Sequence, residues 1–362
     1  MVKVLVVEDS LVVRQVLIRI LESDPQILVV ATAANGEEAI EQTRRHRPDL
    51  ITMDIVMPVM DGLEATRRIM ETTPVPIVVV SASWDPIEVS KTFLALEAGA
   101  LAVLDKPRGV DEPGAGRQAR QLVDTVKLMA EVKLVRRIRR ASVERKASPL
   151  AVPAGLADSP KIRLVAMGAS TGGPPVLATI LSLLGPGFPV PILVTQHIAH
   201  GFTRGLADWL GSTCGLPVQV ASLDGCAQSG QVYIAPDGLH LGVTPDLRFS
   251  FDRGEPENGM RPSVSFLFRS VAQSVGRESA GVLLSGMGRD GAEELKRLRN
   301  IGAVTIAQDE ESSVVFGMPG EAVRLNAASH ILPPERIAGL LKLLAARNAT
   351  RATAMPGGGA HG

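Results

Sequence analysis

The sequence is poor in cysteine, in aromatic residues and in net charge, and each shortage excludes a class of protein. Its 362 residues include 2 cysteines, too few for a disulfide framework or a cysteine-rich zinc site. Aromatic residues make up 3% of the chain and leave few surfaces on which single-stranded nucleic acid can stack. The 38 basic and 38 acidic residues cancel, which argues against a protein drawn to nucleic acid by bulk charge.

The N-terminus also lacks the features of a secretory signal or a membrane anchor. Residues 2–7 form a short apolar run that Glu8 and Asp9 end, and the run is far too short to span a bilayer. We therefore expect a cytoplasmic protein that neither inserts into a membrane nor binds nucleic acid. The chain is 45% hydrophobic, which is enough for compact cores, and its length predicts two domains.

Short apolar runs alternate with helix-period stretches over residues 1–125, which predicts an α/β domain with a five-stranded parallel sheet. The expected strands are 2–7, 27–31, 50–53, 77–80 and 102–104. Helices are expected to begin near Ser10, Gly36, Gly62, Pro86 and Arg117. In a doubly wound sheet of this kind, the functional crevice lies at the carboxyl ends of the strands.

Residues 126–160 are predicted to be a linker, first basic and then rich in proline, alanine and glycine. The basic part is typical of a solvated helix end, and a surface that docks an acidic partner is the alternative. A second α/β pattern over 161–347 predicts a doubly wound, mainly parallel sheet, followed by a disordered tail over 348–362. Its expected strands are 162–167, 192–195, 218–221, 232–234, 248–251, 282–284 and 304–307. Its helices are expected to begin near Pro174, Thr203, Ser263, Gly291 and Pro334.

Polar residues follow four strands of the first predicted sheet. Glu8 and Asp9 follow the first strand, Asp54 the third, Ser81 the fourth and Lys106 the fifth. Carboxylates around one hollow repel each other, and a hard cation such as Mg²⁺ neutralises them. A carboxylate in such a site can attack phosphorus, and a serine hydroxyl and a lysine beside it can bind the new phosphoryl group. Acidic residues at strand ends are also common as loop residues and helix caps.

A second candidate site begins with the segment Gly-Ala-Ser-Thr-Gly-Gly-Pro-Pro at 168–175. A Gly-x-Ser-x-Gly turn between a strand and a helix exposes the hydroxyl of its serine, here Ser170, and the helix N-terminus offers N–H groups to an oxyanion. A phosphate-binding turn or a plain helix cap would also explain the segment.

A nucleophilic serine needs a base, and the base needs a carboxylate to orient it. His197 follows the strand expected at 192–195, and Asp290 follows the strand expected at 282–284, so both belong to the same sheet edge as Ser170. Asp290 can instead cap the helix that follows it. His46 and His361 are expected to be remote and His200 to be a surface or capping residue; His240 and His330 are reserve candidates for the base, with a structural or exposed role the favoured interpretation.

Over residues 1–125 the chain closely resembles the response-regulator receiver domain. The resemblance rests on Glu-Asp-Ser at 8–10, Met-Asp-Ile-Val-Met-Pro-Val-Met-Asp-Gly at 53–62, Ser-Ala at 81–82 and Lys-Pro at 106–107. It implies that Asp54 accepts a phosphoryl group and that Ser81 and Lys106 respond to it. It further implies a Mg²⁺ site formed by Glu8, Asp9, Asp54 and the backbone carbonyl of Val56. Val103 stands where many receivers carry an aromatic switch residue.

Residues 162–345 closely resemble the catalytic domain of the chemotaxis protein-glutamate methylesterases. The matching segments are 168–174, Gln-His at 196–197, Gly-Phe-Thr at 201–203, Tyr-Ile-Ala-Pro at 233–236, His-Leu at 240–241, Arg-Pro-Ser-Val at 261–264, Gly-Met-Gly-Arg-Asp-Gly at 286–291, Ala-Gln-Asp at 307–309 and Gly-Met-Pro at 317–319. The resemblance implies that Ser170 is the nucleophile, His197 the general base and acid, and Asp290 its orienting partner. Met287, with a backbone N–H beside it, and Thr171 are implied to line the site.

The two resemblances together imply a phosphorylation-activated hydrolase for sensory adaptation. Its implied substrates are glutamate methyl esters of chemoreceptors, which release methanol, and receptor glutamines, which release ammonia. A chemotaxis histidine kinase is the implied phosphodonor, Mg²⁺ the implied cofactor of the receiver, and no cofactor is expected in the catalytic domain. The unphosphorylated receiver is implied to cover Ser170. A regulatory binding protein and a nucleotide-binding α/β domain are the alternatives, and the Ser–His–Asp set counts against both.

Overall fold

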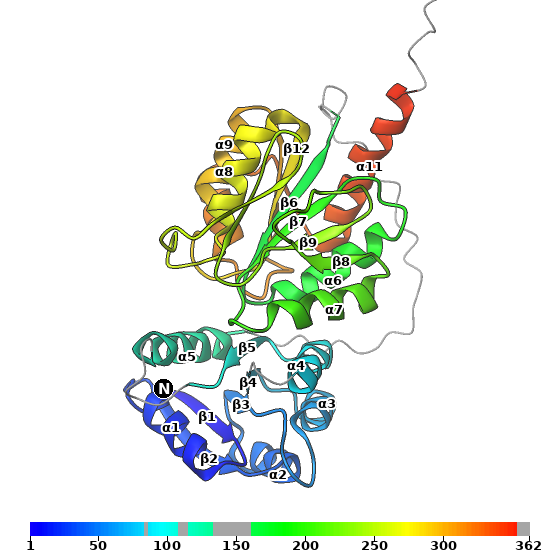
Figure 1. Ribbon diagram of the computed structural model, residues 1–362. Coiled ribbons are helices and arrows are strands. Elements are labelled where there is room, and N and C mark those ends of the chain that lie inside the picture. Colours follow the sequence, from blue (N-terminus) through cyan, green and yellow to red (C-terminus); the bar gives the residue numbers. More distant parts are fainter. Residues whose placement is uncertain (83–85, 108–114, 133–160, 353–362) are drawn as a thin grey trace, which may run out of the picture. The chain divides into compact units, whose positions relative to one another are not determined.

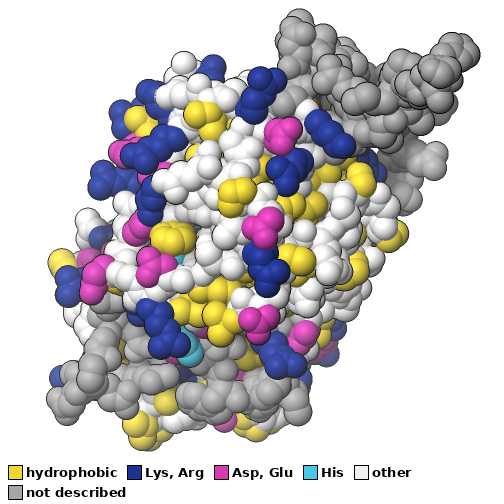
Figure 2. All heavy atoms as spheres, turned by 45° about the horizontal axis from the view of Figure 1, so that its top comes forward, with side chains coloured by type: hydrophobic (Ala, Val, Ile, Leu, Met, Phe, Trp, Pro, Cys, Tyr) yellow, Lys and Arg dark blue, Asp and Glu magenta, His cyan; other side chains and the backbone are white. Residues whose placement is uncertain are grey.

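The computed structural model describes residues 1–82, 86–107, 115–132 and 161–352, and the chain divides into two compact units. Each unit is built around its own sheet and is described by itself. None of the helices within the described residues combines the length and the apolar character that a membrane span requires. On the face seen in Figure 2, basic and acidic side chains are interspersed, as the zero net charge leads one to expect.

The first sheet has five parallel strands in the order β2-β1-β3-β4-β5. Helices α1 and α5 contact each other on one face, and α2, α3 and α4 form a row on the other (Figure 1). The elements are β1 (Val2–Val7), α1 (Leu11–Leu21), β2 (Ile27–Ala33), α2 (Gly36–His46), β3 (Leu50–Met53), α3 (Gly62–Thr72), β4 (Ile77–Ser81), α4 (Pro86–Glu97), β5 (Ala102–Asp105) and α5 (Ala115–Ala130).

Local chemistry explains where the first three of these helices begin. The side chains of Ser10, Asn35 and Asp61 accept hydrogen bonds from the first turns of α1, α2 and α3, as good N-caps do. Gly62 cannot be replaced without strain, because a Cβ atom there would lie 1.9 Å from the carbonyl oxygen of Asp54. The start of α3 is therefore packed directly against the backbone of the third strand's carboxyl end.

The second sheet has seven strands, all paired in parallel, in the order β14-β13-β12-β6-β7-β9-β8. Figure 1 shows α8 and α9 on one face and α6 and α11 on the other. An antiparallel hairpin, β10–β11, lies outside the sheet. The elements are β6 (Leu164–Ala169), α6 (Gly173–Leu184), β7 (Ile192–Gln196), α7 (Thr203–Cys214), β8 (Val218–Val220), β9 (Val232–Ile234), β10 (His240–Val243), β11 (Phe249–Asp252), α8 (Val264–Ser274), η2 (Gly276–Glu278), β12 (Ser279–Leu283), α9 (Ala292–Asn300), β13 (Val304–Gln308), α10 (Met318–Arg324), β14 (His330–Leu332) and α11 (Pro334–Ala352).

Both sheets confirm the predicted fold class, and the departures are short elements. Strands β10 and β14 and helix α10 have no counterpart among the expected elements. Each is too short to show a clear hydrophobic period, so sequence pattern alone cannot separate it from a loop. Helix α5 ends at Ala130, inside the predicted linker, and α11 continues through 348–352, inside the predicted tail. The rest of these two segments, 133–160 and 353–362, lies outside the described residues.

Helix α8 provides much of the apolar core on its face of the second sheet. Leu267, Phe268 and Val271 are fully buried there and pack in one cluster with Leu295 and Leu298 of α9. Because this core lies directly behind the first turn of α8, it fixes the position of that turn, which contributes to the site below.

We expect Phe268→Ala to destabilise the second unit by about 3–5 kcal/mol, since the change removes a buried ring and leaves a cavity. Chemical denaturation followed by far-UV circular dichroism measures this. Leu183→Ala on α6, where the side chain is 43% exposed, is the matched control and should change stability by less than about 0.5 kcal/mol. Equal effects of the two substitutions would contradict the assignment of the core.

Candidate functional site

The acidic residues of the first unit meet at the carboxyl ends of β1 and β3. Oxygen atoms of Glu8, Asp9 and Asp54 lie within 4.8 Å of one another. Glu8 and Asp54 are almost completely buried, whereas Asp9 is exposed. A cluster of carboxylates of this size and donor type fits a hard divalent cation. Val56 lies just after Asp54, with its side chain 49% exposed.

Lys106 compensates the two buried carboxylates. Its Nζ atom lies 2.8 Å from Asp54 Oδ2 and 3.1 Å from Glu8 Oε2. Burial would lower the pKa of Lys106, but the charges of Asp54 and Glu8 outweigh burial and raise it. Burial and the charge of Asp54 raise the pKa of Glu8 to about 7, against the opposing effect of Lys106. Burial likewise raises the pKa of Asp54. One lysine thus leaves the cluster short of positive charge.

Ser81 stands at the end of β4, with its hydroxyl bound to a residue that the sequence did not single out. Ser81 Oγ donates to Glu88 Oε1 over 2.7 Å, and the backbone N–H of Ala82 donates to the same oxygen over 2.6 Å. The Lys106 N–H donates to the carbonyl oxygen of Ser81 over 3.0 Å, so β4 and β5 carry the serine and the lysine side by side. Glu88 was missed because an acidic residue in the first turn of a helix usually signals only an exposed dipole partner.

The second unit brings Ser170, His197 and Asp290 to the ends of three neighbouring strands. Ser170 follows β6, His197 follows β7, and Asp290 lies in the loop after β12. The turn at Ser170 is tight: Gly172 has φ +77°, and the Ser170 N–H donates to the carbonyl oxygen of Ser285 over 3.0 Å. A Cβ atom on Gly286 would lie 2.6 Å from Ser170 Cβ, so the loop after β12 lies directly against the serine.

His197 and Asp290 form a buried pair. His197 Nε2 lies 2.9 Å from Asp290 Oδ2, and the two side chains are 6% and 3% exposed. Since an ionised carboxylate only accepts hydrogen bonds, Nε2 carries the hydrogen and Nδ1 carries the lone pair. His197 Nδ1 is buried without a hydrogen-bond partner among the described residues. The ring therefore presents a free basic nitrogen on the edge opposite Asp290.

Gln196 connects the serine turn to the histidine. Its Nε2 donates to the carbonyl oxygen of Ser170 over 2.7 Å and to that of His197 over 2.9 Å. Gly173 leaves room for this side chain, because a Cβ atom there would lie 2.3 Å from Gln196 Oε1. The sequence showed Gln196 beside His197 but gave no sign of this double contact.

The carboxylate of Asp290 is held by the N-terminus of α8. Asp290 Oδ1 accepts from Ser263 Oγ (2.9 Å), the Ser265 N–H (3.1 Å) and Asn258 Nδ2 (3.1 Å), and Oδ2 accepts from the Val264 N–H (2.7 Å). Burial by itself would raise the pKa of Asp290, but His197 and these donors hold it far below the usual carboxyl range. The alternative interpretation, in which Asp290 caps the following helix, is wrong: the N-cap of α9 is Gly291, and this helix has no side-chain cap.

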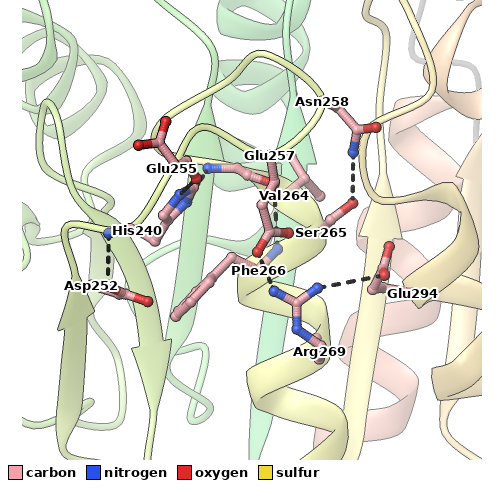
Figure 3. A network of polar contacts seen from close by, with 12 residues as sticks. His240, Asp252, Glu255, Glu257, Asn258, Val264, Ser265, Phe266, Arg269 and Glu294 are labelled. Atoms are coloured by element: carbon pink, nitrogen blue, oxygen red, sulfur yellow. Dashed lines mark hydrogen bonds and ion pairs between the residues drawn. The ribbon is translucent and has the colours of Figure 1, made fainter.

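The loop between β11 and α8 that carries Asn258 is fixed from two sides (Figure 3). Glu257 pairs with Arg269 of α8, which also lies 3.7 Å from Glu294. On the other side, His240 Nε2 lies 3.1 Å from the carbonyl oxygen of Glu255. These contacts keep Asn258, whose φ is +51°, on Asp290.

His240 is a structural residue, as the sequence analysis expected. Its Nδ1 accepts from the Ser263 N–H over 3.2 Å, so its Nε2 must be the donor to Glu255. The ring is 1% exposed and stacks on Phe266 at 4.9 Å between centroids. His330 lies on the edge strand β14, separated from β6 by two strands, and burial lowers its pKa.

The N-terminus of α6 offers fewer free N–H groups beside Ser170 than the sequence analysis expected. Helix α6 begins Gly-Pro-Pro, so Pro174 and Pro175 have no N–H, and the Gly173 N–H is already donated to the Ser170 carbonyl oxygen. The backbone N–H groups of Thr171 and Gly172 in the serine turn, and of Met287 and Gly288 in the loop after β12, have no hydrogen-bond partner among the described residues. The Met287 side chain is 47% exposed beside them.

Comparisons with known proteins connect this geometry to a family. Residues 165–341 match the family model "CheB methylesterase", and residues 4–112 match "Response regulator receiver domain". A protein of Syntrophus aciditrophicus named protein-glutamate methylesterase/protein-glutamine glutaminase 1 is 53% identical over 95% of this chain and 99% of its own. A similarly named protein of Nitrosospira multiformis is 53% identical over 97% of this chain and 99% of its own.

Solved structures are similar to each unit separately. The Thermotoga maritima CheB methylesterase catalytic domain covers 51% of this chain and 98% of its own, at 37% identity and a TM-score of 0.49. The response regulator domain of Thermotoga maritima CheB covers 37% of this chain and 99% of its own, at 35% identity and a TM-score of 0.33. On the identity and coverage of the full-length relatives, this chain belongs to the family of protein-glutamate methylesterases/protein-glutamine glutaminases, hydrolases whose catalytic domain follows a response-regulator receiver domain.

Proposed function

We propose that this hydrolase acts on chemoreceptors in the cytoplasm and is switched on by phosphorylation of Asp54. Its substrates are glutamate methyl esters, which yield methanol, and glutamine side chains, which yield ammonia. The observation that carries the proposal is the buried His197–Asp290 pair, with a free Nδ1, at the strand end next to Ser170. The names of the full-length relatives support both reactions, and the free thiols of Cys214 and Cys226 suit a reducing compartment.

The first chemical step forms an acyl-enzyme. Ser170 Oγ attacks the ester carbonyl carbon and its proton passes to His197 Nδ1. Asp290, kept ionised by the donors of α8, stabilises the imidazolium and fixes its orientation. The N–H groups of Thr171 and Met287 receive the negative charge that develops on the carbonyl oxygen. His197 then returns the proton to the leaving methoxide, and methanol departs.

The second step restores the enzyme. Water attacks the acyl-serine carbonyl carbon while His197 Nδ1 accepts its proton, and the proton then passes to Ser170 Oγ as the bond to the serine breaks. The products are a glutamate side chain and free Ser170. A glutamine amide follows the same route with ammonia as the leaving group.

In this proposal the first unit regulates the hydrolase activity of the second. Asp54 accepts the phosphoryl group from a chemotaxis histidine kinase, with Lys106 in contact with its Oδ2. Glu8, Asp9 and Asp54, with the carbonyl of Val56, are the residues that would hold Mg²⁺, and their clustered oxygens fit it. When bound, Mg²⁺ neutralises the carboxylates and the incoming phosphate. We place the receiver at 1–125, the linker at 126–160, the catalytic domain at 161–347 and the tail at 348–362.

Replacing Ser170 by alanine should reduce methanol release from a methylated receptor fragment by at least about a thousandfold, because no other residue of the site offers a nucleophile at that position. Gas chromatography of the released methanol measures it. Ser222→Ala, at an exposed serine, is the control and should keep full activity. Substantial activity in the Ser170→Ala variant would remove Ser170 from the mechanism.

Replacing Asp54 by asparagine should leave basal methanol release unchanged and abolish its stimulation by acetyl phosphate and Mg²⁺. The reason is that an amide cannot form the acyl phosphate. Asp124→Asn, at an exposed residue of α5, should retain the stimulation. Stimulation that survives in Asp54→Asn would show that the phosphoryl group is carried elsewhere.

The affinity for Mg²⁺ should rise as the pH increases through about 7, because the cation binds ionised carboxylates and the pKa of Glu8 is raised to about 7. Below that pH, Mg²⁺ must displace a proton from Glu8, and its apparent affinity falls. Isothermal titration calorimetry at pH 6, 7 and 8 measures this. In Glu8→Gln the overall affinity should drop and this pH dependence should disappear; a slope unchanged by that substitution would contradict the role of Glu8.

A further inference from the structure

Glu88 is a buried carboxylate that the proposed mechanism does not use. It lies in the first turn of α4 and is 8% exposed. Among the described residues it forms no ion pair, and the contacts that satisfy it there are hydrogen bonds. Burying a carboxylate is costly unless donors satisfy it. Its position is therefore set by the groups that donate to it.

Those donors stand at the carboxyl end of β4, beside the acidic crevice. The Ser81 hydroxyl and the Ala82 N–H both donate to Glu88 Oε1, at 2.7 and 2.6 Å. Thr92, one turn further along α4, contacts Ser81 Oγ at 3.1 Å and the carbonyl oxygen of Glu88 at 2.9 Å. Ser81 and the first two turns of α4 thus form one hydrogen-bonded unit centred on an anion.

A phosphoryl group on Asp54 would need the same hydroxyl hydrogen. It carries nearly two negative charges and three acceptor oxygens. Lys106 touches Asp54 through Nζ and donates its backbone N–H to the carbonyl oxygen of Ser81, so the serine ends the strand next to the one that carries this lysine. Ser81 has one hydrogen to donate and cannot serve two anions at once. The two anions also repel each other.

We propose that Glu88 is a built-in competitor of the phosphoryl group, holding the Ser81 hydroxyl in the unphosphorylated chain and giving it up when Asp54 is phosphorylated. This rests on the proposed role of Asp54 as phosphoacceptor. Once Ser81 turns to the phosphoryl oxygens, Glu88 loses a donor in a buried position next to a new dianion. The carboxylate is expelled toward solvent, and the first turn of α4 moves with it because Glu88 and Thr92 share the contact to Ser81.

Phosphorylation of the full chain by acetyl phosphate in Mg²⁺ tests the proposal, with phospho-Asp54 quantified on phosphate-affinity gels and by mass spectrometry. Glu88→Ala should raise the rate of phosphorylation by about ten- to hundredfold, the effect of losing one charge-assisted hydrogen bond to the competing anion. Glu88→Gln, which keeps an acceptor oxygen but loses the charge, should fall between Glu88→Ala and the unaltered chain. Glu71→Ala, at an exposed glutamate of α3, is the control and should change the rate less than twofold.

The Ser81→Ala variant separates two effects of removing Glu88: the end of the competition for the Ser81 hydroxyl, and the loss of a negative charge near Asp54. If Glu88 acts by holding the Ser81 hydroxyl, adding Glu88→Ala to the Ser81→Ala variant should raise the phosphorylation rate by less than about twofold. An increase as large as the one that Glu88→Ala gives in the chain that retains Ser81 would overturn the proposal. A rate in both Glu88 variants no higher than in the unaltered chain would overturn it too. Binding of beryllium fluoride, a phosphoryl mimic, gives the same comparison at equilibrium.

The same phosphorylation assays distinguish an error in the proposed role of Asp54 from an error in the inference about Glu88. If Asp54→Asn were phosphorylated as well as the unaltered chain, Asp54 would not be the acceptor, whatever Glu88 does. If the unaltered chain is phosphorylated at Asp54 and Glu88→Ala is no faster, only the inference about Glu88 falls. Far-UV circular dichroism of each variant shows that the comparison is made between folded proteins.

Discussion

The buried carboxylate of Asp290 is the charge on which the geometry of the candidate hydrolase site depends. A carboxylate that is 3% exposed persists only if its oxygens are satisfied, and here the N-terminus of α8, Asn258 and His197 satisfy them. Because His197 is one of those donors, the requirement to satisfy Asp290 also decides which ring nitrogen is left free. Packing of α8 through Phe268 and its neighbours keeps these donors in place, so the apolar core and the polar site support each other.

The receiver unit also contains buried carboxylates that must be satisfied, but it has fewer donors for them. Glu8 and Asp54 share Lys106, while Glu88 has hydrogen-bond donors but pairs with no cation among the residues that the structure describes. In the second unit the donors are sufficient, and the pKa of Asp290 is depressed; in the first they are not, and the pKa of Glu8 is raised. Under the proposed function, the hydrolase site keeps one arrangement while the receiver site accepts a cation and a phosphoryl group, and the two sites differ accordingly in how completely their carboxylates are compensated.

The sequence was sufficient to predict those site residues that directly follow a strand. Ser170, His197 and Asp290 each follow an apolar run, and the parallel order β12-β6-β7 brings their loops together. It could not predict contacts that depend on backbone groups or on distant segments. The α8 donors to Asp290 are mostly main-chain N–H groups, which no residue type reveals, and Glu88 has the appearance of an ordinary helix-start acid. Strand β14 and helix α10 were missed because three or seven residues do not establish a period.

The orientation of the His197 ring has a mechanical consequence. With Nε2 turned to Asp290, the nitrogen available to move protons is Nδ1, the ring nitrogen closer to the main chain. Its location is therefore governed mainly by the backbone at the end of β7 and by the first side-chain torsion, rather than by the full reach of the imidazole. Gln196 fastens that same backbone to the serine turn. In the proposed mechanism, the central parallel strand β7 thus holds the proton-accepting atom in place through the side-chain bonds closest to the backbone.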